Sequence, residues 1–392
     1  MNLFHSPIIR LFHLPPLLWL GLLAVLLWFF LPGCITRVDI EPSDFEEHLV
    51  VEGFITDEFG PHEFRITRVA RFAGVLEGGV IEREEAEVRI IDQNGVSTPL
   101  RVRDLQRKEV FNANPPACTP AVTFARVQTN YLSPGNFRGE IGNTYTLEII
   151  TGNGNTYRST PQTMRATPPI QSLQLRFVEL PSLDPVIVPS GVEISASWQD
   201  PPDEENYYSW RVNGIYRINT SEANLPGACC LFDPRDNQAR DCWINETDLQ
   251  GNEIAFSDAQ VNGQLITKAI GFVEDDGLRF ASNAVPFDKQ YYIEIEQYAI
   301  SKEAYDFNQR IRTLQDIDGE IFDPPPLGIR GNINNIDDPS EIVIGHFGAY
   351  AMQKRDIFIP ANLLEFRQRF TSPCGDCRVR AGAQVEIPEP YR

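Results

Sequence analysis

The sequence predicts an all-β protein of two β-sandwich domains, with one short helix over about 301–315 and long loop insertions. Three observations support this fold class. Short runs rich in β-branched and aromatic residues recur about every 8–15 residues, and turn signals separate them. Apolar and polar residues alternate within these runs, as in strands with one buried face. Long segments with the helical period are almost absent.

The first domain is expected over 48–167, because β-rich runs alternate with turn signals there. Strands are predicted at 49–56, 62–70, 86–92, 142–150 and 155–162. Gly60-Pro61 separates the first two runs, and Asn94-Gly95, the strongest two-residue hairpin signal, follows the third. Two adjacent prolines, Pro168 and Pro169, then occur in a segment without periodicity. This segment places the domain boundary near residue 167.

The second domain, 168–392, begins with a clearly alternating strand. Its apolar positions are Val192, Ile194, Ala196 and Trp198. An acidic Pro turn follows, and then a strand that contains Tyr208 and Trp210. A strand, a W-x-D-P-P turn and a Tyr-rich strand together resemble the B–C region of fibronectin type III domains, in which the tryptophan belongs to the core. We therefore expect immunoglobulin- or fibronectin-III-like sandwiches, with both tryptophans buried.

The one helix is predicted from a capping residue and an apolar stripe. Ser301 is a suitable N-cap, and Glu303 lies in the first turn, where a negative charge is favourable. The stripe consists of Ala304, Phe307, Ile311 and Leu314. Three successive prolines at 324–326 prevent the helix from continuing through that segment. The stripe is expected to face the core.

The amino terminus has the features of a lipoprotein signal peptide. Residues 17–31 are uninterruptedly apolar, a run shorter than the roughly 20 residues that a spanning helix needs. Leu31-Pro32-Gly33-Cys34 follows and resembles the bacterial lipobox, although Pro32 departs from the usual small residue. We expect a signal peptide over 1–33, lipidation of Cys34 and an acidic tether over 34–47. The alternative for the apolar run is an uncleaved membrane anchor. The acidic residues after Cys34 are either a surface-export signal or a solvated tether.

Charge and cysteine content agree with an exported protein. A net charge of −20 opposes binding to phosphate backbones, so nucleic acid is not an expected partner. Besides Cys34 there are six cysteines: Cys118, Cys229, Cys230, Cys242, Cys374 and Cys377. An even number is compatible with structural disulfides, and Cys374 or Cys377 would pair with one of the Cys229, Cys230 and Cys242 group. A redox or zinc role for Cys374-Gly-Asp-Cys377 is disfavoured, because no second half-site is present.

The sequence contains no recognisable catalytic constellation. The histidines after the signal segment are His48, His62 and His346, and neither a G-x-S-x-G nor an HExxH motif occurs. We therefore expect no enzymatic activity. A carboxylate glycosidase is a less favoured alternative, since acids are abundant enough for chance pairs. Its candidates are Asp200, Glu204, Glu274, Asp275 and Asp276.

No cofactor is expected, but calcium is an alternative for the acidic loops. Asp316, Asp318 and Glu320 resemble the start of an EF-hand loop that lacks its distal glutamate. Further oxygen ligands are offered by Asn332, Asn334, Asn335, Asp337 and Asp338. A solvated acidic turn is the favoured explanation of either group. Glycan binding would need exposed aromatic residues, for which the candidates are Trp243, Tyr291, Tyr292 and Tyr298.

Several stretches in a fixed order resemble one family. They are 49–61, 86–95, 205–212, 297–307, 322–333, 341–350 and the terminal Cys374–Cys377 segment. The chain resembles the Bacteroidota exported-lipoprotein family catalogued as domain-of-unknown-function family 4249, over essentially everything after the signal peptide. The resemblance implies an envelope location, a two-part β-rich architecture and genes near TonB-dependent outer-membrane receptors. It implies no catalytic residues.

These observations lead to an expected function. The protein would be a lipoprotein of the outer membrane, anchored through acylated Cys34, and a non-enzymatic accessory or binding subunit of a TonB-dependent transporter or related assembly. Contact surface would come from 225–245, which contains Trp243, and from the loop 323–331 with Pro324, Pro325 and Pro326. The alternative is a free-standing glycan- or peptide-binding surface lipoprotein.

Overall fold

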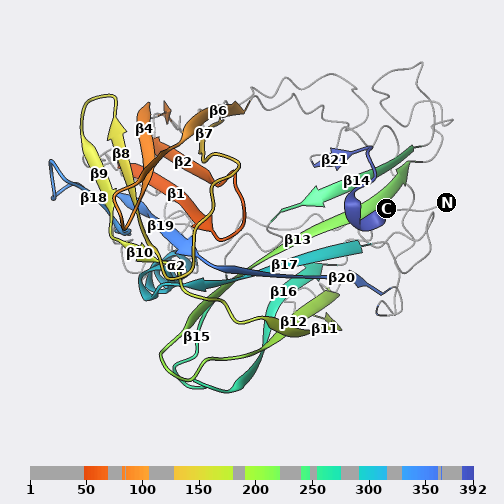
Figure 1. Cartoon of the computed structure of the whole chain (residues 1–392). Coiled ribbons are helices and arrows are strands. Elements are labelled where there is room, and N and C mark those ends of the chain that lie inside the picture. Colours follow the sequence, from red (N-terminus) through yellow and green to blue (C-terminus); the bar gives the residue numbers. More distant parts are fainter. Residues whose placement is uncertain are drawn as a thin grey trace, which may run out of the picture. The chain divides into compact units, whose positions relative to one another are not determined.

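Strands dominate the part of the chain that the structure describes. The computed structural model describes residues 48–68, 82–83, 85–105, 128–179, 190–220, 240–247, 254–274, 291–315, 329–360, 363 and 382–392. Within these ranges lie 21 strands, the helix α2 (Lys302–Gln315) and a short 3-10 turn, η4 (Glu389–Tyr391). The strands form four sheets, here called A to D (Figure 1).

Sheets A and B form the first packed pair. Sheet A contains β1 (Leu49–Thr56), β2 (Glu63–Arg68), β3 (Glu82–Arg83), β6 (Arg101–Leu105), β7 (Gln128–Leu132) and β19 (Ile344–Tyr350). Its order is β19-β1-β2-β7-β6, with β3 beside β2. Sheet B contains β4 (Ala86–Asp92), β5 (Ser97–Pro99), β8 (Thr144–Thr151), β9 (Thr156–Ser159), β10 (Gln162–Thr163) and β18 (Ile333–Asn335). Its order is β18-β9-β8-β4-β5, with β10 beside β8.

One hydrophobic core lies between sheets A and B. Alternate residues of each strand point into it, as the period-2 pattern of the sequence predicts. Sheet A contributes Leu49, Val51, Ile55, Phe64 and Ile66, and sheet B contributes Val88, Ile90, Leu147, Ile149 and Tyr157. All of these side chains are buried, so apolar burial of both inner faces stabilises the pair.

Sheets C and D form the second packed pair. Sheet C has the order β11 (Ile170–Glu179), β12 (Ser190–Gln199), β16 (Leu265–Glu274). Sheet D contains β13 (Tyr207–Thr220), β14 (Arg240–Glu246), β15 (Ile254–Ser257), β17 (Tyr291–Ile300), β20 (Met352–Ile359) and β21 (Ala383–Gln384). Its order is β20-β17-β13-β14-β21, with β15 beside β13.

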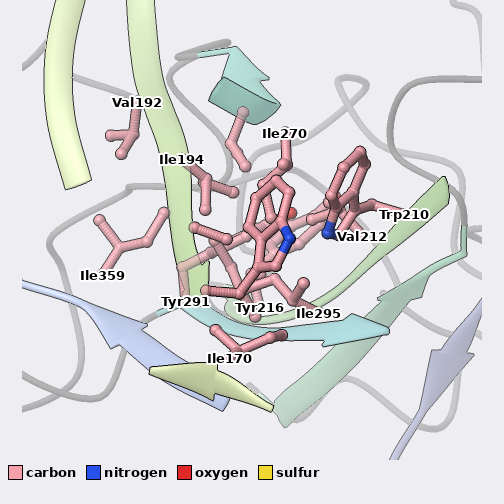
Figure 2. Close-up of a cluster of buried hydrophobic side chains, with 14 of the residues drawn as sticks. Ile170, Val192, Ile194, Trp210, Val212, Tyr216, Ile270, Tyr291, Ile295 and Ile359 are labelled. Carbon is pink, nitrogen blue, oxygen red and sulfur yellow. The ribbon is translucent and has the colours of Figure 1, made fainter. Parts of the chain in front are cut away.

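A second core, rich in aromatic residues, lies between sheets C and D. Figure 2 shows Ile194, Trp210, Ile270 and Tyr291 gathered in this core, to which residues of both sheets contribute. Trp198 is fully buried, and its ring centroid lies 5.2 Å from that of Trp210. The prediction that both tryptophans belong to the core is confirmed.

Two strands from late in the chain complete the first pair of sheets. β19 pairs in parallel with β1, with Val51 opposite Gly345, and β18 pairs with β9. β18 and β19 therefore belong to sheets B and A, although they follow the segment near residue 167 at which the sequence suggests a boundary. The boundary itself stays a prediction.

The helix α2 begins and packs as predicted. The Ser301 hydroxyl accepts a hydrogen bond from the Ala304 N–H at 3.2 Å, which is N-cap geometry. Ala304 and Phe307 are buried, so this part of the apolar stripe faces inward. α2 lies against β13, β15 and β19 and thus contacts both pairs of sheets (Figure 1).

The expectation of a mostly-β chain with a single α-helix is confirmed for the described ranges. The four sheets are antiparallel except for the parallel β1–β19 pair, which makes sheet A mixed. An immunoglobulin- or fibronectin-III-like identity is a finer statement than this architecture, and it stays a prediction.

Candidate functional site

A cleft of about 720 Å³ opens where sheet A, sheet D and α2 meet. Its walls come from β1, β2, β13, β17, β19, β20 and α2. The volume lies within the range of roughly 300–1,000 Å³ that is common for ligand sites. The lining mixes charged, aromatic and aliphatic side chains, so the cleft is suited to a ligand with both polar and apolar parts.

Strand periodicity places charged residues of sheet D on the cleft side. On β17, Ile293 and Ile295 point into the core shared with sheet C. The alternate residues Glu294, Glu296 and Tyr298 therefore lie on the opposite face. Glu296 and Tyr298 line the cleft directly. One face of the same strand thus stabilises the fold while the other supplies the site.

Three neighbouring strands carry a row of alternating charge along this face. Arg211 of β13 lies opposite Glu296 of β17, which lies opposite Lys354 of β20. Only 9% of Glu296 is exposed, and its carboxylate accepts a 2.6 Å hydrogen bond from the Tyr298 hydroxyl. Its other oxygen is 3.7 Å from the Lys354 Nζ. The buried acid is held in one orientation by these contacts.

Aromatic rings form the wall beside this row. The Phe54 ring lies 5.3 Å from Tyr298 and 5.4 Å from Tyr350, measured between centroids. The Arg211 guanidinium stands 5.3 Å from the centroid of Phe54, within cation–π range. At the cleft rim Phe59 is 63% exposed and lies under the Arg138 guanidinium.

Two neutral histidines also line the cleft. Burial lowers the pKa of His346 to about 4, although the charge of Glu303 acts in the opposite direction. Burial likewise lowers the pKa of His62, against a hydrogen bond with the Phe137 backbone. Each Nε2 is buried and has no hydrogen-bond partner among the described residues. Both rings are therefore uncharged at neutral pH, and no described serine or cysteine lines the cleft to act as a nucleophile beside them.

Next to the charged row lies a second row, in which acids predominate. Asn213 of β13 is opposite Glu294 of β17, which is opposite Asp356 of β20. Burial raises the pKa of Glu294, and the negative charges of Glu296, Asp356 and Glu58 add to this, while Lys354 opposes it. Because Glu58 lines the cleft, the acidic row adjoins the cleft at this end.

Two of the carboxylates suggested for glycoside cleavage, Asp200 and Glu204, have partners within the protein. Asp200 is buried and accepts hydrogen bonds from the Tyr208 hydroxyl at 2.6 Å and the Gly263 N–H at 2.8 Å. Asp200 also hydrogen-bonds with the buried Asp258. The two carboxyl groups are therefore closer together than the roughly 5 Å or more that separates the catalytic pair of a glycosidase. Glu204 instead forms an ion pair with Arg165 at the surface, 2.8 Å apart. Glu274 ends β16, and Asp275 and Asp276 lie outside the described residues.

The aromatic residues suggested for glycan stacking are largely buried. Trp243 is only 6% exposed, its ring centroid lies 6.3 Å from that of Tyr391, and the Arg217 guanidinium covers it. Tyr291 and Tyr298 are buried as well. The burial contradicts the expectation of an exposed Trp243 contact, because a stacking platform needs an open ring face.

Other sites suggested by the sequence fall largely outside the described residues. They are Cys34, Cys118, Cys229, Cys230, Cys374, Cys377, Asp316, Asp318, Glu320, Pro324, Pro325 and Pro326. Cys242 is described and fully buried in the core between sheets C and D. Lipidation, disulfide pairing, and calcium binding at 316–320 therefore stay predictions.

The second group of oxygen ligands serves local structure. The Asp337 carboxylate accepts a hydrogen bond from the Thr156 N–H at 2.7 Å, and Asn335 Oδ1 accepts one from the Asp337 N–H at 2.8 Å. These contacts join the turn after β18 to sheet B. In the described part of the chain, no three His, Cys, Asp or Glu residues come together in a group that could hold a metal ion.

These features define a class: a β-rich protein with two hydrophobic cores and a charged, aromatic cleft where the two pairs of sheets meet. The chain belongs to the family described as Domain of unknown function (DUF4249), whose model matches residues 35–356. Every residue that lines the cleft lies within this match. A search of curated proteins finds no match. No helix in the described ranges has the length and apolar character that crossing a membrane requires.

Sequence reasoning missed the residues that build the cleft. Alternation along 291–300 places Glu294 and Glu296 on one face, and that signal was available. The pairing that puts Arg211 and Lys354 beside Glu296 joins distant segments. No local pattern in the sequence indicates it.

Proposed function

We propose that the protein is a non-enzymatic, lipid-anchored binding subunit of the cell envelope, which works beside a TonB-dependent outer-membrane receptor or a related assembly. The cleft is the observation that carries this proposal. It combines charged and aromatic side chains from two sheets and a helix, as binding sites commonly do. The apolar run 17–31 before Cys34 supports the membrane anchor. The gene neighbourhood expected for the family supports a receptor as the partner.

The proposed mechanism depends on position. Two acyl chains on Cys34 would hold the protein firmly at the membrane surface. Confinement to that surface raises the effective concentration of the cleft beside an integral partner, so even a weak contact becomes substantially occupied. The subunit would present its ligand or its own cleft to the receptor without changing a covalent bond.

Co-purification tests this function. A tagged full-length chain is crosslinked in intact cells, extracted in mild detergent and purified, and its partners are identified by mass spectrometry. A Cys34→Ala chain with the same tag is the matched control, because it would lack the anchor. We expect a stoichiometric β-barrel receptor with the unaltered chain and little with the control. Recovery of the lipidated chain alone would refute the receptor role.

The aromatic wall of the cleft favours a second function, a free-standing glycan- or peptide-binding lipoprotein. Phe54 is half-buried and Phe59 is exposed, so part of this wall is accessible to a ligand. This reading predicts saturable binding by the purified chain without any receptor. A glycan and peptide array without any binding signal, together with an unchanged melting temperature for every ligand, would refute this second function.

A further inference from the structure

We propose that the cleft binds a short, neutral oligosaccharide, with hydroxyl groups on the floor formed by sheet A and one sugar ring against Phe59 at the rim. The inference deepens the proposed function and rests on the cleft being its binding site. Three features of the lining support it: a buried imidazole nitrogen without a partner, nearly balanced charges, and an exposed aromatic ring.

His346 of β19 offers the cleft a polar atom that no described residue satisfies. Its neighbour Phe347 belongs to the core between sheets A and B, so the His346 side chain lies on the opposite face of the strand, on the cleft side. The imidazole centroid is 5.9 Å from that of Phe307 on α2. Its Nδ1 lies 3.4 Å from the Tyr350 hydroxyl, whereas its Nε2 is buried and makes no hydrogen bond. Such an atom costs free energy until a ligand supplies a partner.

A hydroxyl group is the partner that suits His346 best. Burial lowers the pKa of His346 to about 4, so at neutral pH the ring carries no charge that would attract an anion. One nitrogen of a neutral imidazole donates and the other accepts, and the contact with Tyr350 is compatible with either tautomer. A hydroxyl both donates and accepts, so it can bond with Nε2 in both cases. An ammonium only donates, and a carboxylate only accepts.

Two more polar side chains continue the floor beside His346. Glu52 of β1 lies opposite His346 on one side and opposite Arg65 of β2 on the other. Glu52 and Arg65 form an ion pair of 3.0 Å, and their side chains are 58% and 45% exposed. Sugar hydroxyls can donate to the carboxylate and accept from the guanidinium together. Because adjacent strands are about 4.8 Å apart, a ring with several hydroxyls reaches neighbouring members of this row.

The charges of the lining are nearly balanced, which favours a neutral ligand over an ion. Among the described residues that line the cleft, four are acids and three are bases: Glu52, Glu58, Glu63 and Glu296, and Arg65, Arg211 and Lys354. Besides the pair on the floor, the Lys354 Nζ lies 3.7 Å from the Glu296 carboxylate on the opposite wall. A bound ion would therefore meet charges of both signs on each wall, without a strong field of either sign to attract it.

Phe59 supplies the aromatic surface at the rim. It is 63% exposed, although a ring of this size gains free energy from burial. The Arg138 guanidinium lies 4.7 Å from the ring centroid, and much of the ring is still accessible. The C–H groups of a sugar ring form an apolar face that can pack on such a ring, while its hydroxyls point outward to polar partners. The cleft offers both kinds of surface within one cavity.

An extended peptide fits the cleft less well, because peptides of this kind bind chiefly to open strand edges. Four of the six strands that wall the cleft, β1, β2, β13 and β17, are interior strands of their sheets. The edge strands are β19 and β20. The Asn332 side chain bonds with the Phe347 backbone on β19, and the Met352 N–H of β20 donates to Asp57. The cleft therefore recognises its ligand mainly through side chains.

Calorimetric titration of the full-length chain tests the proposal, in a polyoxyethylene detergent because sugar-based detergents would compete. The probes are the neutral trisaccharides cellotriose, maltotriose, mannotriose and triacetylchitotriose, with trigalacturonic acid and acetylated, amidated tri-alanine as comparisons. We expect at least one neutral trisaccharide to bind about tenfold more tightly than the acid or the peptide, with little change when salt is raised. No binding by any neutral trisaccharide, or equal binding of the acid or the peptide, would overturn the proposal.

Matched variants locate the binding to the cleft. His346→Phe keeps a planar ring beside Phe307 and removes Nε2, so affinity should fall about tenfold, as for loss of roughly 1.4 kcal/mol. His48→Phe, outside the lining, is its control. Phe59→Ala, at an exposed position, should also weaken binding without affecting the fold. Its control is Val96→Ala, which is 61% exposed and outside the lining. Both controls should bind like the unaltered chain.

If His346→Phe and Phe59→Ala both bind like their controls, the cleft is not the sugar site and the proposal fails. Should His346→Phe not fold, the exposed Phe59→Ala variant decides the question alone. Failure here is distinguishable from failure of the receptor role, because the titration uses the purified chain without a receptor. A receptor that co-purifies with a chain that binds no sugar would leave the proposed function standing and overturn only this inference.

Discussion

The side-chain amide of Asn332 forms two hydrogen bonds with the backbone of Phe347: its Nδ2 donates to the carbonyl oxygen, and its Oδ1 accepts from the N–H, each at 2.9 Å. A neighbouring strand would make the same pair of bonds in an antiparallel ladder. Asn332 thus provides hydrogen-bond partners for part of the outer edge of β19, which is an edge strand of sheet A. Since β19 also lines the cleft, this asparagine supports a wall of the site.

Replacement of Asn332 by Ala should destabilise the protein. It leaves the Phe347 N–H and C=O without their partner at a buried position, which typically costs about 1–3 kcal/mol per group. We expect a loss of about 2–4 kcal/mol in the free energy of unfolding, measured by chemical denaturation. Asn334→Ala is the control, because Asn334 is exposed. Equal stability of the two variants would contradict this role.

Gly345→Ala should disrupt the parallel pairing of β1 with β19. Gly345 has a φ of +110°, and a Cβ built on it would lie 1.9 Å from the Val51 carbonyl oxygen. The backbone of β1 cannot yield that much without losing hydrogen bonds to β19. We expect a fall of more than ~2 kcal/mol in the free energy of unfolding or loss of soluble protein. Gly135→Ala, which would meet no atom within 4 Å, should be nearly neutral, and similar losses for both would refute the argument.

Local patterns in the sequence predicted the elements better than their arrangement. Alternation identified the buried tryptophan strand, and the Ser301 cap and apolar stripe identified α2, because both signals come from residues close together in the chain. The segment 341–350 was recognisably strand-like. Its parallel partner is β1, at the other end of the described chain, and parallel pairing over such separation leaves no local signature.

The candidate site was harder to predict for the same reason. Charged residues such as Arg211, Glu296 and Lys354 are individually ordinary in strands with a solvated face. They become a site only when sheet register sets them side by side and α2 and β1 enclose them. Trp243 was singled out because the sequence offered no core role for it, whereas Tyr391 and Arg217 in fact cover it.

Glu148→Gln should make the protein less stable at neutral pH but not in acid. Burial acts to raise the pKa of Glu148, but Arg158 and Arg89 outweigh it and lower the pKa below its usual value of 4.5. The carboxylate therefore stabilises the fold above pH 4.5, and this contribution is lost as pH falls through the lowered pKa. With both arginines nearly half exposed, we expect a loss of about 1–2 kcal/mol at pH 7, seen by denaturation.

Glu193→Gln is the control for that measurement, since Glu193 forms a single ion pair with the largely exposed Arg176. Its effect should be within about 0.5 kcal/mol. A loss of stability by Glu148→Gln that is the same at pH 3 and pH 7 would show that packing, not the ion pairs, is responsible.

Asp258→Asn should have the opposite dependence on pH. Burial raises the pKa of Asp258 above its usual 3.8, and contact with Asp200 adds to this while hydrogen bonds from Asn206 oppose it. Asp258 therefore favours the folded state most below pH 3.8, and its contribution falls as pH rises through the raised pKa. An amide keeps an acceptor for the Asn206 N–H and donates to Asp200 without repulsion.

The stability of the variant relative to the unaltered chain should therefore be greater at neutral pH than at pH 3. Thermal unfolding of both proteins at the two pH values measures this difference. Asp203→Asn, at an exposed position in the loop between β12 and β13 that also contains Asp200, should show no such difference. An Asp258→Asn variant whose relative stability is the same at both pH values would exclude a shared proton in this pair.

The proposed function makes the cleft the place where this protein meets its partner, and photo-crosslinking tests this most directly. A photoreactive amino acid is placed in the full-length chain at Phe59, 63% exposed on the cleft rim, or at Val96, 61% exposed at a hairpin turn that does not line the cleft. The account predicts a β-barrel receptor crosslinked in cells from Phe59 and not from Val96. No product from Phe59, or the same product from both positions, would contradict it.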